Sequence, residues 1–126
     1  MAQHPLPFRD PEVQAFLAGK PAYSLALLDQ FLEAFQTVGP VTLHAAKTMV
    51  GISNGRSRIA WITQLGKQFL HVVLPFATAY EDNFCFQKIA QVPGQQQYNH
   101  HLRIVQAEDI NEEVLRFLRL AYGNKD

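Results

Sequence analysis

Histidine and cysteine are the residues of this chain that could bind a metal ion, and their spacing shows whether they are suited to it. Four of the five histidines and the single cysteine, Cys85, lie between residues 41 and 107. A structural zinc site needs four convergent thiolate or imidazole ligands, yet the chain has no Cys-x₂-Cys pair. We therefore expect no metal site and no cofactor. The four histidines are His44, His71, His100 and His101.

Nucleophilic catalysis finds equally little support in the residue pattern. Cys85 stands between two phenylalanines, a setting typical of a small buried hydrophobic residue. The stretch 53–57 (SNGRS) has the composition of a phosphate loop. It joins two predicted strands, however, and so lacks the helix N-terminus that would hold a phosphate. We predict no catalytic residue, and an enzyme of unknown reaction remains an open alternative.

Charge is sorted along the chain, and this sorting supplies the best candidate site. Residues 41–107 contain six basic residues and two acids, whereas the flanks contain five basic residues and nine acids. If the middle forms one sheet, that sheet has a face suited to anions, which its basic side chains would hold by charge-assisted hydrogen bonds. The candidate ligand-binding residues are Lys47, His71, Lys88, His101 and Arg103, with Trp61 as a candidate stacking surface.

A second interpretation of these residues stays open. Lysines and arginines on an exposed sheet face also keep a protein soluble and block edge-to-edge pairing. Trp61 then belongs to the core. Strand alternation places His101 and Arg103 on one face. On the other face we expect His100 to be hydrogen-bonded and half-buried beside Leu102 and Ile104.

The size and composition indicate one globular domain. The chain has 126 residues, of which 48% are hydrophobic and 17% are charged. No run of about 18 apolar residues is present, so we expect no membrane span. The N-terminus lacks a basic region followed by an apolar one, and the lone cysteine fits a reducing cytoplasm.

The elements that must position these residues are a sheet and two main helices. We expect residues 1–23 to form an arm with a short helix that Asp10 caps, and residues 24–126 to form a single α+β domain. Ser24 would cap a helix that Gly39 and Pro40 end. Asp109 would begin the last helix. The predicted strands span residues 41–44, 48–52, 58–64, 69–76, 84–90 and 97–105.

Short links between these strands favour a mostly antiparallel meander of five or six strands. The clearest strand is 69–76, in which Leu70, Val72 and Leu74 alternate with His71 and Val73. Both main helices carry one apolar stripe, so we expect them to pack on one face of the sheet and leave the other face open.

Seven short stretches carry a likeness to a known family through their order and spacing. They are Leu27–Phe35, Val38–Val41, Lys47-Thr48, Lys88-Ile89, Tyr98–Arg103, Glu108–Glu112 and Ala121-Tyr122. Together they resemble a small bacterial family known as domain of unknown function 5655. The likeness covers about Ser24 to Tyr122, and it implies the fold and a bacterial setting without catalytic residues. More distantly, the last strand and helix are similar to those of YjbR-like and frataxin-like small α+β domains.

The sequence therefore favours a non-catalytic cytoplasmic module that receives an anionic group of a small ligand or partner. A nucleic-acid-associated domain is an alternative, although an isoelectric point near 7 is below the range typical of such domains. A homodimeric interaction module is another, in which Phe8, Phe16 and Tyr23 contact a partner. If the protein is not such a module, we expect the N-terminal segment that carries these residues to fold back onto the core of its own chain.

Overall fold

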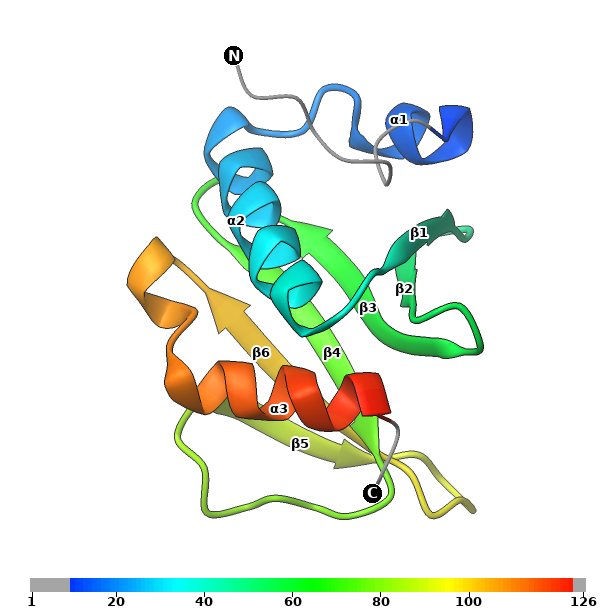
Figure 1. The fold of residues 1–126 in the computed structure, drawn as a ribbon, viewed down its shortest axis with the longest axis vertical. Coiled ribbons are helices and arrows are strands. Elements are labelled where there is room, and N and C mark those ends of the chain that lie inside the picture. The colour runs from blue at the N-terminus through cyan, green and yellow to red at the C-terminus, as the bar shows by residue number, and fades with distance from the viewer. Residues whose placement is uncertain (1–9, 124–126) are drawn as a thin grey trace.

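The computed structural model describes residues 10–123 and confirms an α+β fold with helices at both ends of the chain (Figure 1). A short 3₁₀ turn, η2 (Ala107–Asp109), separates the last strand from the last helix. The helices are α1 (Pro11–Leu17), α2 (Ala22–Val38) and α3 (Glu112–Gly123). The strands are β1 (Thr42–Ala45), β2 (Val50–Ser53), β3 (Arg58–Leu65), β4 (Leu70–Phe76), β5 (Phe86–Gln91) and β6 (Tyr98–Ile104).

All six strands form one antiparallel sheet in the order β1-β2-β3-β4-β6-β5. The first four strands form the expected meander. The last two exchange places, because the chain leaves β4 along residues 77–85, forms β5 at the edge, and returns to place β6 beside β4 (Figure 1). As a result β4 and β6 are neighbours, and so are the side chains that they carry.

The core lies between the sheet and the two long helices, which cover one face as expected (Figure 1). Leu70, Val72 and Leu74 of β4 are fully buried on that face. Because side chains alternate along a strand, the intervening residues of β4 and β6 point to the opposite face. Helix α2 contributes Leu28, Phe31 and Phe35 to the core, and α3 contributes Val114, Phe117 and Leu118.

Helix α1 packs on the same core through Val13 and Leu17. The carboxylate of Asp10 accepts hydrogen bonds from the backbone N–H groups of Glu12 and Val13, which confirms the predicted cap. The rest of the predicted arm, residues 1–9 with Phe8, lies outside the described residues.

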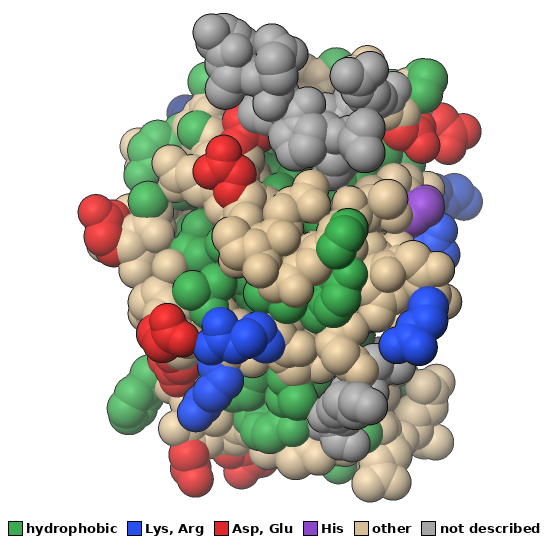
Figure 2. Space-filling view, viewed as in Figure 1, with side chains coloured by type: hydrophobic (Ala, Val, Ile, Leu, Met, Phe, Trp, Pro, Cys, Tyr) green, Lys and Arg blue, Asp and Glu red, His purple; other side chains and the backbone are tan. Residues whose placement is uncertain are grey.

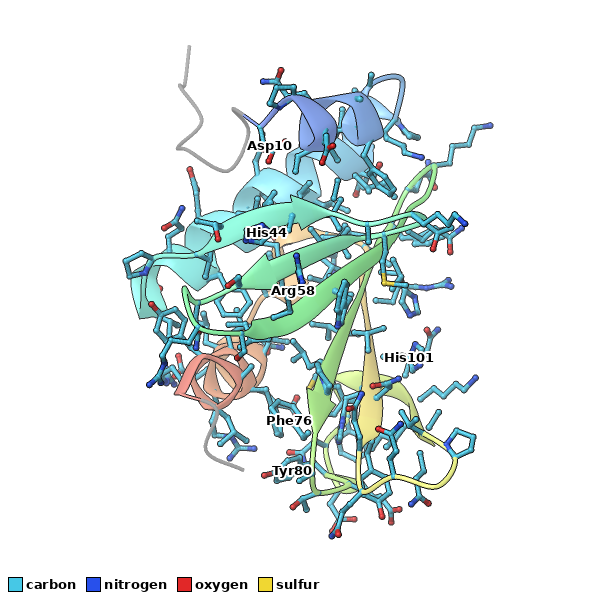
Figure 3. All side chains as sticks on the ribbon, turned by 90° about the vertical axis from the view of Figure 1, so that its right-hand side faces the viewer. Asp10, His44, Arg58, Phe76, Tyr80 and His101 are labelled. Atoms are coloured by element: carbon cyan, nitrogen blue, oxygen red, sulfur yellow. The ribbon has the colours of Figure 1, made fainter. Side chains whose placement is uncertain are left out.

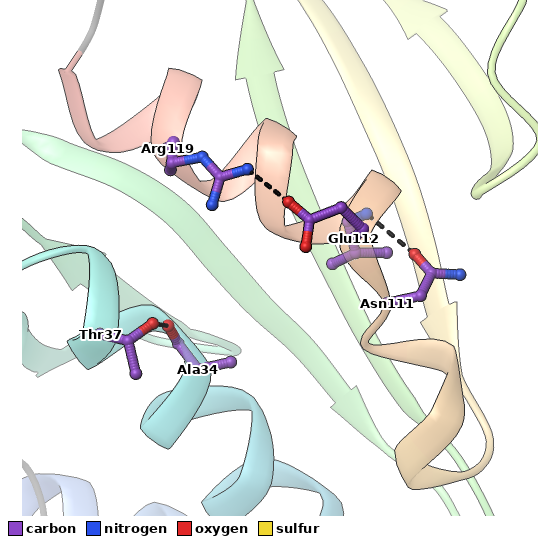
Figure 4. Close-up of polar contacts among 6 residues, drawn as sticks. Ala34, Thr37, Asn111, Glu112 and Arg119 are labelled. Carbon is purple, nitrogen blue, oxygen red and sulfur yellow. Dashed lines mark hydrogen bonds and ion pairs between the residues drawn. The ribbon is translucent and has the colours of Figure 1, made fainter.

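Two predicted helix starts were wrong by a few residues. Helix α2 begins at Ala22 after Pro21, and the hydroxyl of Ser24 donates to the Pro21 carbonyl from inside the helix. Helix α3 begins at Glu112, where the Asn111 side chain accepts from the Val114 N–H at 3.0 Å (Figure 4). Asp109 instead caps the 3₁₀ turn.

Candidate functional site

Four of the five predicted ligand-binding residues lie together on the sheet face away from the helices. On the paired strands β4 and β6, His71 lies opposite Arg103, and Val73 lies opposite His101. On β5 and β6, Lys88 lies opposite His101. Figure 3 shows His101 on the side of the sheet away from α3. We call this group, His71, Lys88, His101 and Arg103, the cationic patch.

The centre of the patch is a hydrogen bond between two imidazoles. Nε2 of His71 and Nδ1 of His101 lie 2.9 Å apart, and the two rings meet edge to face. One of these nitrogens must donate and the other must accept, so at least one ring is neutral in this arrangement. The Nδ1 of His71 and the Nε2 of His101 take no part in this hydrogen bond.

Burial and the surrounding positive charge both disfavour protonation of the pair. Desolvation lowers the pKa of His71 below 6.5, and His101, Arg103 and Lys88 lower it further. Desolvation also lowers the pKa of His101, with smaller contributions from Lys88 and His100. The permanent charge of the patch at neutral pH therefore comes from Lys88 and Arg103. Their positive charge disfavours protonation of the His71–His101 pair.

No carboxylate among the strand residues offsets this field. The six strands contain no Asp or Glu, and the acids of the described chain lie on helices, in loops or at caps. Between residues 10 and 123, the cations of the patch form no ion pair. The basic middle of the sequence thus forms a sheet whose strands carry no acidic side chain.

Aromatic side chains support the cations beside the patch. The Arg103 guanidinium lies 4.3 Å from the centre of the Phe69 ring. Trp61 lies opposite Val73 in the register of β3 and β4, and Val73 is only 6% exposed although it faces away from the core. Half-buried Trp61 therefore stands one strand away from the His pair and can offer part of its ring to a ligand.

The structure does not bring Lys47 to the patch. Lys47 is exposed in the turn that joins β1 and β2, where the Ala46 N–H donates to the Met49 carbonyl. Strand β3 separates this hairpin from β4. His44 and Arg58 lie on the β1–β3 part of the sheet, above His101 in Figure 3.

His100, the immediate neighbour of His101, has a structural role on the core face. It is fully buried, its Nε2 accepts from the Tyr80 N–H at 3.1 Å, and its Nδ1 donates to the Tyr98 carbonyl at 2.8 Å. The ring packs against Phe76 and Phe86. The prediction of a hydrogen-bonded histidine is therefore confirmed, with deeper burial than expected.

The thiol of Cys85 is not disposed to act as a nucleophile. Burial and the nearby Glu113 raise its pKa to about 12, so the thiolate is scarce at neutral pH. Within residues 10–123, no group of three or more His, Cys, Asp or Glu side chains is placed to hold a metal ion. A helix long and apolar enough to cross a bilayer is also missing from this range.

Comparison with protein families matches residues 13–125 to a family described as a domain of unknown function, DUF5655. The chain belongs to the DUF5655 family. This match confirms the resemblance seen in the sequence and extends it into α1, since it begins at Val13. Comparisons of the DUF5655 chain with curated proteins and with solved structures gave no significant match.

Sequence reasoning missed a second feature of this DUF5655 domain, on the opposite side of the molecule. A cavity of about 610 Å³ lies between α3 and the loop 77–85. The loop brings Tyr80 and Asn83 to α3, a contact that no local pattern indicates. Its signal in the sequence is indirect: the acid and amide run 81–83 predicts a loop there.

Proposed function

We propose that this DUF5655 domain is a non-catalytic module that binds an anionic group on the cationic patch. The observation that supports the proposal is the placement of Lys88, Arg103 and the His71–His101 pair on one face that the helices leave open. These side chains come from three adjacent strands, so the sheet holds their spacing fixed before a ligand arrives. The cellular setting that we propose is the cytoplasm.

The proposed contacts follow from the donor geometry of each residue. Arg103 offers a planar fork that suits a carboxylate or phosphate, and its stacking on Phe69 limits the freedom that binding must remove. Lys88 offers a point charge from the neighbouring strand. A bound anion also favours protonation of the histidines, which then donate to it.

The ligand class that we favour is a small anion or a single anionic group of a partner. The patch has two permanent charges, whereas nucleic acids are bound by longer tracks of cations and aromatic residues. Trp61 and Arg58, whose guanidinium lies 5.9 Å from the Trp61 ring centre, extend the patch along β3. A single-stranded nucleic acid is therefore the alternative ligand, and the experiment below distinguishes it from a small anion.

The test is an NMR titration of the histidine C–H signals with sulfate and with pyrophosphate at constant ionic strength. We expect shifts at His71 and His101 that saturate. In Lys88→Gln/Arg103→Gln the affinity should fall at least about tenfold, because a hydrogen bond to a charged group contributes about 1.5–3 kcal/mol and tenfold corresponds to about 1.4 kcal/mol.

The matched control is Lys47→Gln/Lys67→Gln, which removes the same net charge from exposed positions outside the strands. This variant should bind as the unmodified chain does. An equal loss of affinity in both double variants would show that only the net charge of the chain matters. The absence of saturable shifts with either anion would refute the proposal. Tighter binding of an oligonucleotide than of pyrophosphate, with a steep salt dependence, would favour the nucleic-acid alternative.

A further inference from the structure

A fully exposed phenylalanine projects from the loop that follows β4. Phe84 is 98% exposed, whereas its neighbours Cys85 and Phe86 pack against the core. The sequence pattern placed Phe84 in a strand, but β5 begins only at Phe86. Covering a phenyl ring removes apolar surface from water, so this residue is an unused source of binding free energy.

The cavity between α3 and the same loop is the complementary feature. Tyr80, Phe117 and Leu120 give it apolar walls, and Arg116 and Arg119 also line it. Two hydrogen bonds hold the arginines in place. Arg116 donates to Asn83 at 3.0 Å. Arg119 donates to Glu112 at 2.8 Å, as Figure 4 shows. In Figure 2 the apolar surface below the basic side chains of α3 is open to the viewer.

We propose that the occupant of this cavity is Phe84 of a second copy of this chain. Within one copy Phe84 cannot be the occupant, because it is almost fully exposed. Asn83 lines the cavity, so the exposed ring and the hollow lie one residue apart in the chain. If a two-fold axis lies beside the loop, each copy places its phenyl ring in the cavity of the other. Both rings are then covered in one symmetric interface.

Charge complementarity supports this arrangement. Glu81 and Asp82 are exposed on the loop that carries Phe84, whereas Arg116 and Arg119 are two of the residues that line the cavity that receives it. Arg119 already pairs with Glu112, while Arg116 forms no ion pair within residues 10–123. The two-fold exchange therefore brings the acids of each loop to the arginines of the partner. None of these residues belongs to the cationic patch, so the contact goes beyond the proposed anion binding and does not depend on it.

Sedimentation equilibrium of the full chain, over about 10 µM to about 1 mM, tests the contact in the range expected of a small interface. The unmodified chain should show a monomer–dimer equilibrium, and Phe84→Ala should weaken it at least about tenfold, about 1.4 kcal/mol. Val105→Ala is the matched control, since it trims another exposed apolar side chain, and should leave the equilibrium unchanged. Thermal melts of the dilute variants should coincide, because Phe84 makes little contact in the monomer.

Charge reversal distinguishes this specific contact from nonspecific association. Asp82→Arg and Arg116→Asp should each weaken the dimer, and the two together should restore much of the loss, because each copy then carries the reversed pair. Benzoylphenylalanine at position 84 should cross-link to residues 116–120 of an isotope-labelled second copy. A chain that stays monomeric at about 1 mM, or a dimer that is unchanged by Phe84→Ala or cross-links elsewhere, would overturn the proposal.

Discussion

The two adjacent histidines of β6 show how one residue step changes the role of a side chain. His100 faces the core, where both ring nitrogens are hydrogen-bonded and three aromatic neighbours surround the ring. His101 faces the open side and shares a hydrogen bond with His71. The alternation of a strand is sufficient to separate a structural imidazole from one that is available to a ligand.

Lowered histidine pKa values predict that the stability of the protein falls in mild acid. The pKa of His71 and of His101 lies below 6.5 in the folded protein and near that value in the unfolded chain. As the pH falls through 6.5, the unfolded chain therefore binds more protons, so the free energy of unfolding decreases until the folded pKa values are passed.

Urea denaturation at about pH 7.5 and about pH 5.5 measures this difference. In His71→Asn/His101→Asn the decrease in the free energy of unfolding between the two pH values should be smaller than in the unmodified chain. His44→Asn, on β1 and outside the patch, is the control for the same change of residue type elsewhere in the sheet. An unchanged pH dependence in the double variant would show that other groups dominate it.

Much of the residue pattern could be interpreted from the sequence alone. The alternation around Leu70, Val72 and Leu74 indicates which face of β4 is buried, and the same rule places His101 and Arg103 together. The hydrogen bond between His71 and His101 could not be predicted, because it depends on β4 and β6 being neighbours. Short links favour pairing of consecutive strands, and they do not indicate the exchange that places β6 beside β4.

At the scale of elements, the starts of α2 and α3 could be predicted only to within a few residues. Several polar residues near each start can act as caps, and the packing of the helix decides which one does. At α3 the chain makes a 3₁₀ turn first, so the capping side chain is Asn111 in place of Asp109. Gly39, by contrast, ends α2 as its pattern indicated.

The cap of α3 gives a prediction at this scale. Asn111→Ala leaves the Val114 N–H without its side-chain acceptor and should lower the free energy of unfolding by about 1 kcal/mol. Asn111→Asp keeps an acceptor at the same place and should be close to the unmodified chain. Chemical denaturation measures both, and an Ala variant as stable as the Asp variant would contradict the assignment of the cap.

At the scale of the whole molecule, the sheet divides the protein into two surfaces with different chemistry. One side carries the cationic patch on bare strands, and the other carries the helices, the cavity and the exposed phenylalanine. The sheet lies between the two surfaces, so the proposed anion site and the proposed contact with a second copy would not compete for the same surface. The zero net charge of the chain conceals this division.

Hydrogen exchange should report the position of each strand in the sheet. Strand β4 pairs on both sides and buries Leu70, Val72 and Leu74 completely, whereas β1 and β5 are edges that pair on one side only. We expect the amides of β4 and the β4-facing amides of β6 to exchange most slowly, and those of β5 most rapidly among the strands. Protection of β5 equal to that of β4 would contradict this sheet order.

The exchanged order of the last two strands has a consequence for synthesis. Residues 86–91 leave the ribosome before residues 98–104, which form the only strand beside them in the sheet, so β5 must wait without a pairing partner while the meander is already in place. A waiting strand presents unpaired backbone groups to any other nascent chain. Lys88 stands in the middle of that strand, and a charged side chain there discourages such mispairing.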